Sequence, residues 1–305
     1  MTLSPYELIA NDFRHERQQR LGRTQINSAD FEALARAGFL KLSVPQQMGG
    51  DWRSVAESGP TIAEATRSIA RGDPSVALVA AMHPAVVAYW HPSSTEEPLP
   101  DQAKHTFATA LDGHWWGTMM SEPGSGGDLQ KTKTQATALR DSFHLTGEKH
   151  FGSGSGQTSF MVTTARIDDQ VDLFVVDMRD KQWDGTQGLT LLREWDGHGM
   201  TGTQSHAFTL TACEAQRAES PDPFEVAIRQ TSSLSGVLFC AVIVGILDEA
   251  FAAHLKKLEA KKSSMRALEQ VELVRAKNEH WQAVTLYCAV RDAMGKPHGL
   301  VDARQ

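Results

Sequence analysis

The order of the secondary-structure patterns along the chain is the strongest constraint on its fold. Between residues 113 and 213, β-branched and polar residues alternate in short segments, separated by turn sequences such as Asp168-Asp169 and Asp184-Gly185. This period of two predicts an antiparallel sandwich or barrel. Helical patterns lie on both sides, and no Gly-x-Gly-x-x-Gly follows a strand. The order therefore predicts an α+β fold and argues against a doubly wound dinucleotide-binding sheet.

Apolar residues at helical spacing predict the elements on either side of the β region. The expected helices are one beginning at Ser28, then 54–71, 75–90, a short one ending near Leu111, one from Phe224 to about Lys262, and one from about Arg266 to Met294. We predict an N-terminal helical domain over 1–112, a central β domain over 113–222 and a shortened C-terminal helical domain over 223–305.

Composition narrows the possible partners and location. The 305 residues carry a formal net charge of −7 and no long basic run, which argues against a nucleic-acid partner. Three separated cysteines without a Cys-x-x-Cys pair argue against a disulfide framework, and no secretory signal is visible, so a cytoplasmic location is expected. The apolar run 234–247 is too short to span a bilayer, so we expect a buried helix and no membrane span.

Two loops rich in glycine and serine carry the chemistry. The first, SEPGSGGD at 121–128, holds three glycines within four residues, and the second, LTGEKHFGSGSG at 145–156, sets an aromatic residue beside hydroxyls. Glycine permits positive φ and close approach of backbone to a ligand. Two such loops at neighbouring strand ends predict a clasp for a planar, hydrogen-bonding ligand. A tight hairpin and a flexible linker are the structural alternatives.

Together with WDGHGMTGTQSH at 195–206, these loops resemble three successive signatures of the acyl-CoA dehydrogenase superfamily. The segments 37–50 and 70–77 resemble its N-terminal helical segments, so the resemblance covers about residues 28 to 293. It implies FAD, or FMN as the alternative, held between the β domain and the C-terminal helices. The principal expectation is α,β-oxidation of an acyl thioester by an oxidoreductase.

The resemblance also implies roles for individual residues. A flavin would meet Met119, Met120 and Ser121 at its pyrimidine edge, with Phe151 against the ring and Ser153 near N5. The diphosphate would meet Lys262 or Arg266, and the substrate would lie near Ser125 and Gly127. A flavin needs donors at the edge that becomes anionic on reduction and an apolar wall elsewhere.

Three departures from the family pattern keep other functions open. Gly127 replaces a usual Ser, Phe151-Gly-Ser-Gly154 is more similar to the flavin monooxygenase branch, and Thr231 stands where some dehydrogenases carry the catalytic Glu. The last two bundle helices have no counterpart, and no catalytic base is found. The alternatives are a reduced-flavin-dependent monooxygenase, with His83 as its candidate catalytic residue, and a non-catalytic partner subunit.

The expected partners follow from the same resemblance. They are acyl-CoA or a related small molecule, and an electron-transfer protein or dioxygen. The apolar run 234–247 and the family pattern predict a homodimer or homotetramer. No His, Cys and Asp cluster has metal-ligand spacing, so no metal is expected. The histidines His198 and His206 in the third signature are expected to be structural.

Overall fold

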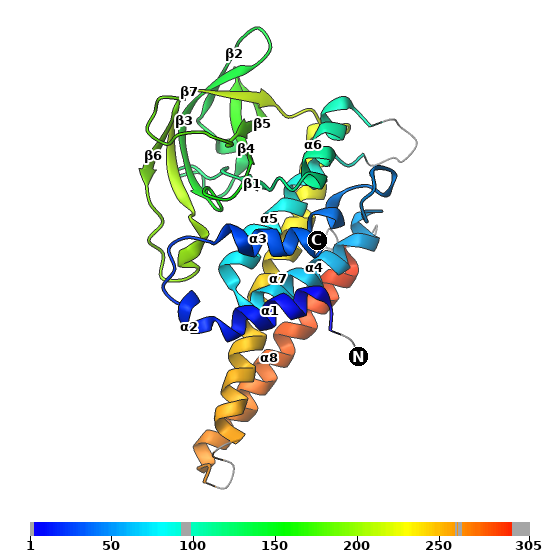
Figure 1. The fold of residues 1–305 in the computed structure, drawn as a ribbon, viewed down its shortest axis with the longest axis vertical. Coiled ribbons are helices and arrows are strands. Elements are labelled where there is room, and N and C mark those ends of the chain that lie inside the picture. Colours follow the sequence, from blue (N-terminus) through cyan, green and yellow to red (C-terminus); the bar gives the residue numbers. More distant parts are fainter. Residues whose placement is uncertain (1–2, 93–98, 260, 262–263, 295–305) are drawn as a thin grey trace.

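The structure, a computed structural model, describes residues 3–92, 99–259, 261 and 264–294. Helices precede and follow a central β region, which confirms the α+β fold (Figure 1). The helices are α1 Pro5–His15, α2 Arg17–Arg20, α3 Ser28–Arg36, α4 Val55–Gly72, α5 Pro74–Val87, α6 Asp101–Leu111, α7 Phe224–Glu259 and α8 Ala267–Ala293. The strands are β1 Trp116–Thr118, β2 Gln135–Ala138, β3 Phe143–Gly152, β4 Phe160–Ile167, β5 Gln170–Asp177, β6 Leu189–Arg193 and β7 His206–Arg217.

The strands close into a barrel. They are ordered β1-β4-β2-β3-β7-β5, β5 also pairs with β4, and β6 is attached to β7. Most pairs are antiparallel as expected, but β1 and β2 each pair with β4 in parallel, which corrects the wholly antiparallel prediction. Parallel neighbours need a long connection, and the chain between β1 and β4 supplies one by way of β2 and β3.

The helices before and after the barrel share one core. The long α7 packs on α4 and α5, and its Leu234, Leu238 and Ala241 are buried together with Ile62 of α4. Side-chain capping fixes where α4 and α5 begin, because Ser54 accepts a hydrogen bond from Glu57 N and the Asp73 carboxylate accepts from the first turn of α5. The barrel therefore lies beside one helical body formed by both ends of the chain, as Figure 1 shows.

An aromatic layer joins the barrel to the helices. Trp116 of β1 stacks on Phe160 of β4 with ring centroids 4.6 Å apart, and Trp90 meets Trp116 edge to face at 5.1 Å. Phe107 of α6 is buried in the same cluster. Aromatic pairs of this kind add about 0.5–1.5 kcal/mol each beyond the burial of their area. The layer sets the distance between β1, β4 and α5, and so shapes the cavities at its edges.

The apolar run 234–247 is only partly buried, which corrects the expectation of a buried helix. It lies within the 36-residue α7, where Phe239, Ile243 and Leu247 stay exposed, Ile243 by 55%. Among the described residues α7 is the one helix long and apolar enough to cross a membrane, and a third of its most apolar window is buried. This is weak evidence for a membrane span, since the core helix of a soluble protein meets the same criterion.

Candidate functional site

A cavity of about 270 Å³ lies where the barrel meets α5 and α7. Its wall is mostly apolar, with hydroxyl groups from Thr118, Thr231, Ser232 and Ser235, and none of the described side chains that line it is charged. The apolar wall comes from α5, the barrel and α7, and includes Met82, Val86, Tyr89, Met120, Val162, Leu173, Ile228 and Phe239. Such a cavity favours a neutral, largely apolar molecule, because burying an unpaired charge is costly.

The structure separates the two methionines that precede the first loop. Met120 lines the cavity, whereas Met119 is fully buried in the barrel core, where its carbonyl accepts a hydrogen bond from Thr163 Oγ1 at 2.7 Å. Successive residues of an extended chain point in opposite directions. Of the two, only the Met120 side chain can therefore contact a ligand in this cavity.

The two residues assigned to the substrate differ in the same way. Gly127 lines the cavity and has φ of +82°, a conformation that glycine adopts without strain. Ser125 is buried, and its Oγ donates to the carbonyl of Glu122 at 3.0 Å and accepts from Gly127 N at 3.3 Å. Ser125 thus shapes the first loop, while Gly127 presents backbone to the cavity.

The second loop lies beside the first. His150 N donates to the carbonyl of Ser121 at 2.8 Å, and Phe151 follows with φ of +56°, which is rare for a bulky residue. The Phe151 ring is 55% exposed and meets Trp195 edge to face at 6.1 Å. Strained backbone conformations cluster at functional sites. An exposed aromatic ring held in such a conformation is suited to packing against a planar ligand.

A chain of buried hydroxyls lies behind Phe151. Ser153 Oγ is 2.7 Å from Ser205 Oγ, which is 2.7 Å from Thr203 Oγ1. The loop also approaches α5 closely, because a Cβ at Gly154 would lie 2.5 Å from Val79 Cγ1. The structure thus places Ser153 in a hydroxyl network that joins the second loop to the segment around 203–205.

A buried ion pair ties the two loops together. Glu122 follows Ser121, and its carboxylate accepts from Lys149 Nζ at 2.5 Å, from Thr134 Oγ1 at 2.7 Å, from the Thr132 hydroxyl and from the backbone nitrogens of Lys133 and Thr134. Burial alone would raise the pKa of Glu122, but these donors, Lys149 first, lower it to about 2. Burial lowers the pKa of Lys149. The pair therefore links Glu122, at the start of the first loop, to Lys149 of β3, close to Phe151 in the second loop.

His83 lies in the core, away from the cavity. It is fully buried, its Nδ1 accepts from Trp116 N at 3.1 Å, and its ring lies 5.4 Å from that of Trp115. Burial lowers the pKa of His83 to about 3, so the imidazole is neutral at physiological pH. The cavity is lined instead by the neighbouring Met82, and this placement counts against a catalytic role for His83.

Of the two cations assigned to a diphosphate, the structure describes Arg266, which lies where α8 begins. Lys262 falls outside the described residues. Arg266 is the N-terminal capping residue of α8, and its backbone nitrogen donates to Glu269 at 2.9 Å. Within this chain, the structure brings Met120, Gly127 and the two loops to one region and leaves Arg266 on the α7–α8 turn.

Sequence reasoning missed the helical half of the cavity. Tyr89, Ser232, Ser235 and Phe239 line it, and none of them belongs to a glycine-rich loop. The available signal was Thr231, which lines the same wall and lies one residue before Ser232. The Glu122–Lys149 pair was missed as well, although both residues stand inside the quoted motifs.

Comparison with known proteins agrees with this geometry. Residues 117–213 match the family model described as acyl-CoA dehydrogenase, middle domain. FMN-bound TdsC from Paenibacillus sp. A11-2 superposes with a TM-score of 0.73 at 20% identity, over 95% of this chain and 74% of that one. The resemblance to the acyl-CoA dehydrogenase superfamily is thereby confirmed, and the chain has that superfamily's fold.

Curated relatives include both monooxygenases and dehydrogenases. A probable FMNH2-dependent monooxygenase, SfnC of Pseudomonas putida, is 23% identical over 90% of this chain and 67% of its own length. Dibenzothiophene monooxygenase of Rhodococcus erythropolis is 25% identical over 74% and 54%. Benzylmalonyl-CoA dehydrogenase of Aromatoleum aromaticum is 22% identical over 81% and 64%. The chain thus spans between about half and two thirds of the length of these relatives.

Proposed function

We propose that this protein is a flavin-dependent monooxygenase that acts on a small, neutral, apolar substrate. One observation carries the proposal: the cavity beside the two loops is lined by apolar and hydroxyl side chains, with Thr231 on its α7 wall. Dehydrogenation of an acyl thioester needs a carboxylate to remove the α proton, and Thr231 offers only a hydroxyl, which donates to the Ala227 carbonyl at 2.9 Å. The similarity to SfnC and TdsC, whose names include FMN, supports the same choice.

The donor set of the two loops fits a flavin. Gly127 presents backbone to the cavity, Phe151 offers an exposed aromatic side chain, and Ser153 carries a buried hydroxyl within two residues of it. Ser121 joins the first loop to the second, since its carbonyl accepts from His150 N. We infer that these residues would hold FMN, with FAD as the alternative. Reduced flavin would supply the electrons that activate dioxygen. Lys262 and Arg266 stay candidates for a diphosphate only if FAD is the cofactor.

The residues of this chain would bind the substrate and exclude water from it. Tyr89 and Phe239 bring aromatic surface to the cavity from two helices, and Ser232 and Ser235 offer hydroxyls that can orient a polar substituent. Burial raises the pKa of the Tyr89 phenol well above its usual range, so it stays protonated and can act as a hydrogen-bond donor. A dry cavity also protects reactive species from hydrolysis and proton leakage.

The test is a comparison of two reactions on the flavin-loaded protein. We expect that, with reduced flavin, air and indole or a thiophene as substrate, one oxygen atom enters the product, as detected by mass spectrometry with labelled dioxygen. We also expect no flavin bleaching on anaerobic mixing with acyl-CoAs of several chain lengths. Bleaching by an acyl-CoA alone would refute the monooxygenase.

A flavin-dependent acyl-CoA dehydrogenase is the second candidate. Its support is the matched middle domain and the similarity to benzylmalonyl-CoA dehydrogenase. The bleaching experiment decides between the two enzymes. A protein that takes up neither FMN nor FAD would instead support a non-catalytic partner subunit.

We infer that the protein forms a homodimer or homotetramer in the cytoplasm. Phe239, Ile243 and Leu247 recur at helical spacing and are exposed along α7, and such a row is usually covered. Light scattering should give a mass of at least two chains, and Ile243→Glu should lower it toward one. A single-chain mass for the unaltered protein would contradict this inference.

A further inference from the structure

The third signature, residues 195–206, lies against the second loop. Gly154 N donates to the Thr203 carbonyl at 2.7 Å, and at the start of the signature Trp195 meets the Phe151 ring edge to face. We propose that Trp195 is a positioning residue of the flavin site, which holds the Phe151 ring in the orientation that packs on the flavin. The inference rests on the proposed function, since it needs a flavin beside Phe151.

Phe151 has little else to hold its ring. It is 55% exposed, and the described rings that meet it are those of His150, its neighbour in β3, at 6.2 Å and of Trp195 at 6.1 Å. Exposed side chains change rotamer within picoseconds to nanoseconds, and fixing a mobile side chain on binding costs free energy. A Phe151 ring that Trp195 already holds in place avoids part of that cost.

Trp195 is itself fixed by three contacts. Its backbone nitrogen donates to His206 Nδ1 at 3.0 Å, and its indole Nε1 donates to the Met200 carbonyl at 3.1 Å. Burial lowers the pKa of His206, which keeps the imidazole neutral at physiological pH and leaves Nδ1 able to accept. The indole also lies against Gly197, where a Cβ would be 2.1 Å from Cζ2. Trp195 can therefore hold a second ring without a large loss of its own freedom.

Two glycines of the same segment supply a matched pair of variants. A Cβ at Gly197 would overlap the indole, whereas a Cβ at Gly199 would meet no described atom within 4 Å apart from its chain neighbours. Neither glycine has a positive φ, so the backbone accepts alanine at both positions. Gly197→Ala should therefore displace the Trp195 ring, and Gly199→Ala should leave it in place.

The test measures FMN affinity by fluorescence titration, with urea unfolding as the check that each variant is folded. We expect Trp195→Leu and Gly197→Ala to weaken FMN binding by about two- to tenfold, the range of an aromatic edge contact. Gly199→Ala should leave the affinity unchanged. Gly197→Ala keeps the test decisive if Trp195→Leu does not fold.

A double-mutant cycle separates positioning from a general effect on the fold. If Trp195 acts through the Phe151 ring, Trp195→Leu should have little further effect on FMN affinity in Phe151→Leu. An unchanged affinity in Trp195→Leu, an equal loss with and without the Phe151 ring, or equal losses in Gly197→Ala and Gly199→Ala would overturn this inference alone. An unaltered protein that binds neither FMN nor FAD would overturn the proposed function and this inference with it.

Discussion

Two buried ion-pair networks stabilise different parts of this molecule, and they are built differently. In the barrel, Glu122 and Lys149 have side chains that are 3% and 0% exposed, and threonine hydroxyls and backbone nitrogens complete their hydrogen bonds. In the helical body, Arg20 stands among the three carboxylates of Glu16, Asp30 and Asp73. The barrel network is a closed pair, whereas the helical network centres on Arg20, which three carboxylates share, and Arg23 adds a second cation at Asp30.

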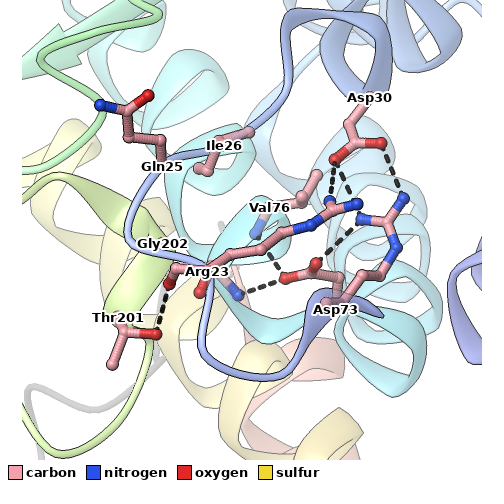
Figure 2. A pocket seen from close by; sticks show the side chains of 10 residues that line it. Arg23, Gln25, Ile26, Asp30, Asp73, Val76, Thr201 and Gly202 are labelled. Atoms are coloured by element: carbon pink, nitrogen blue, oxygen red, sulfur yellow. Dashed lines mark hydrogen bonds and ion pairs between the residues drawn. The ribbon is translucent and has the colours of Figure 1, made fainter. Parts of the chain in front are cut away.

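Their surroundings differ as well. Figure 2 shows Asp30 and Asp73 facing the guanidinium groups, while Thr201 of the barrel loop donates to the carbonyl of Arg23. The pocket there encloses about 30 Å³, room for roughly one water molecule, so the ion pairs largely fill it. The helical network fastens chain segments together. The barrel network joins the two loops that we propose hold a flavin, so its disruption tests the proposed function as well as the stability.

The largest expected effect is from Glu122→Gln. It leaves the ammonium of Lys149 buried without a counter-charge. The NH₂ group of the new amide is a donor and cannot accept the hydrogen bonds that the carboxylate oxygen accepted. Breaking a buried pair in this way costs about 3–5 kcal/mol in the free energy of unfolding. Urea unfolding should measure it. The control is Glu148→Gln in the neighbouring exposed pair with His150, expected to cost less than about 1 kcal/mol. Equal losses in the two variants would contradict the closed-pair description.

A smaller loss is expected from Arg20→Met. The guanidinium is 7% exposed, but Glu16 is 47% exposed, Asp30 keeps its ion pair with Arg23, and Asp73 keeps its hydrogen bonds from the first turn of α5. Each carboxylate therefore retains a partner or solvent. The loss should be about 1.5–3 kcal/mol, the range of a hydrogen bond to a charged group, measured by the same urea unfolding. Arg275→Met removes an exposed i,i+4 pair with Glu279 and should cost about 0.5 kcal/mol or less. A loss for Arg20→Met above that for Glu122→Gln would reverse the comparison.

The acid response tests the charge state of Glu122 in the barrel network. The pKa of Glu122 is lowered from 4.5 to about 2 in the folded protein, so its stabilising contribution is complete above 4.5 and is lost as pH falls toward 2. The difference in unfolding free energy between the unaltered protein and Glu122→Gln should therefore be constant at neutral pH and shrink between pH 4.5 and 2. A difference that stays constant down to pH 2 would show that folding does not lower the pKa of Glu122.

The sequence predicted the barrel loops better than the helical half of the site. Both loops, 121–128 and 145–156, are short segments whose glycines and serines can be read directly from the sequence. In the structure, an isolated antiparallel bridge between Ser121 and His150 brings them together. The cavity wall depends instead on how α7 packs against α5, which brings Phe239 and Tyr89 to the same cavity. No local pattern encodes that packing.

The partial exposure of α7 could not be predicted for the same reason. Hydropathy marks 234–247 as apolar but does not say which face packs on α4. His83 is a similar case, because its spacing on an apolar helix did not reveal that its Nδ1 pairs with Trp116 N. Likewise, β-branched alternation predicts strands, but not that β1 runs parallel to β4.

Flavin titration of three proteins tests the central claim, that the loops joined by Glu122 and Lys149 form the flavin site. FMN and FAD are titrated into the unaltered protein, Glu122→Gln and Arg20→Met under conditions where all three are folded by circular dichroism, with flavin fluorescence as the readout. We predict saturable binding of one flavin per chain, weakened by roughly tenfold or more in Glu122→Gln, equivalent to about 1.4 kcal/mol or more, and nearly unchanged in Arg20→Met. Absence of flavin binding in the unaltered protein, or equal weakening in both variants, would contradict the account.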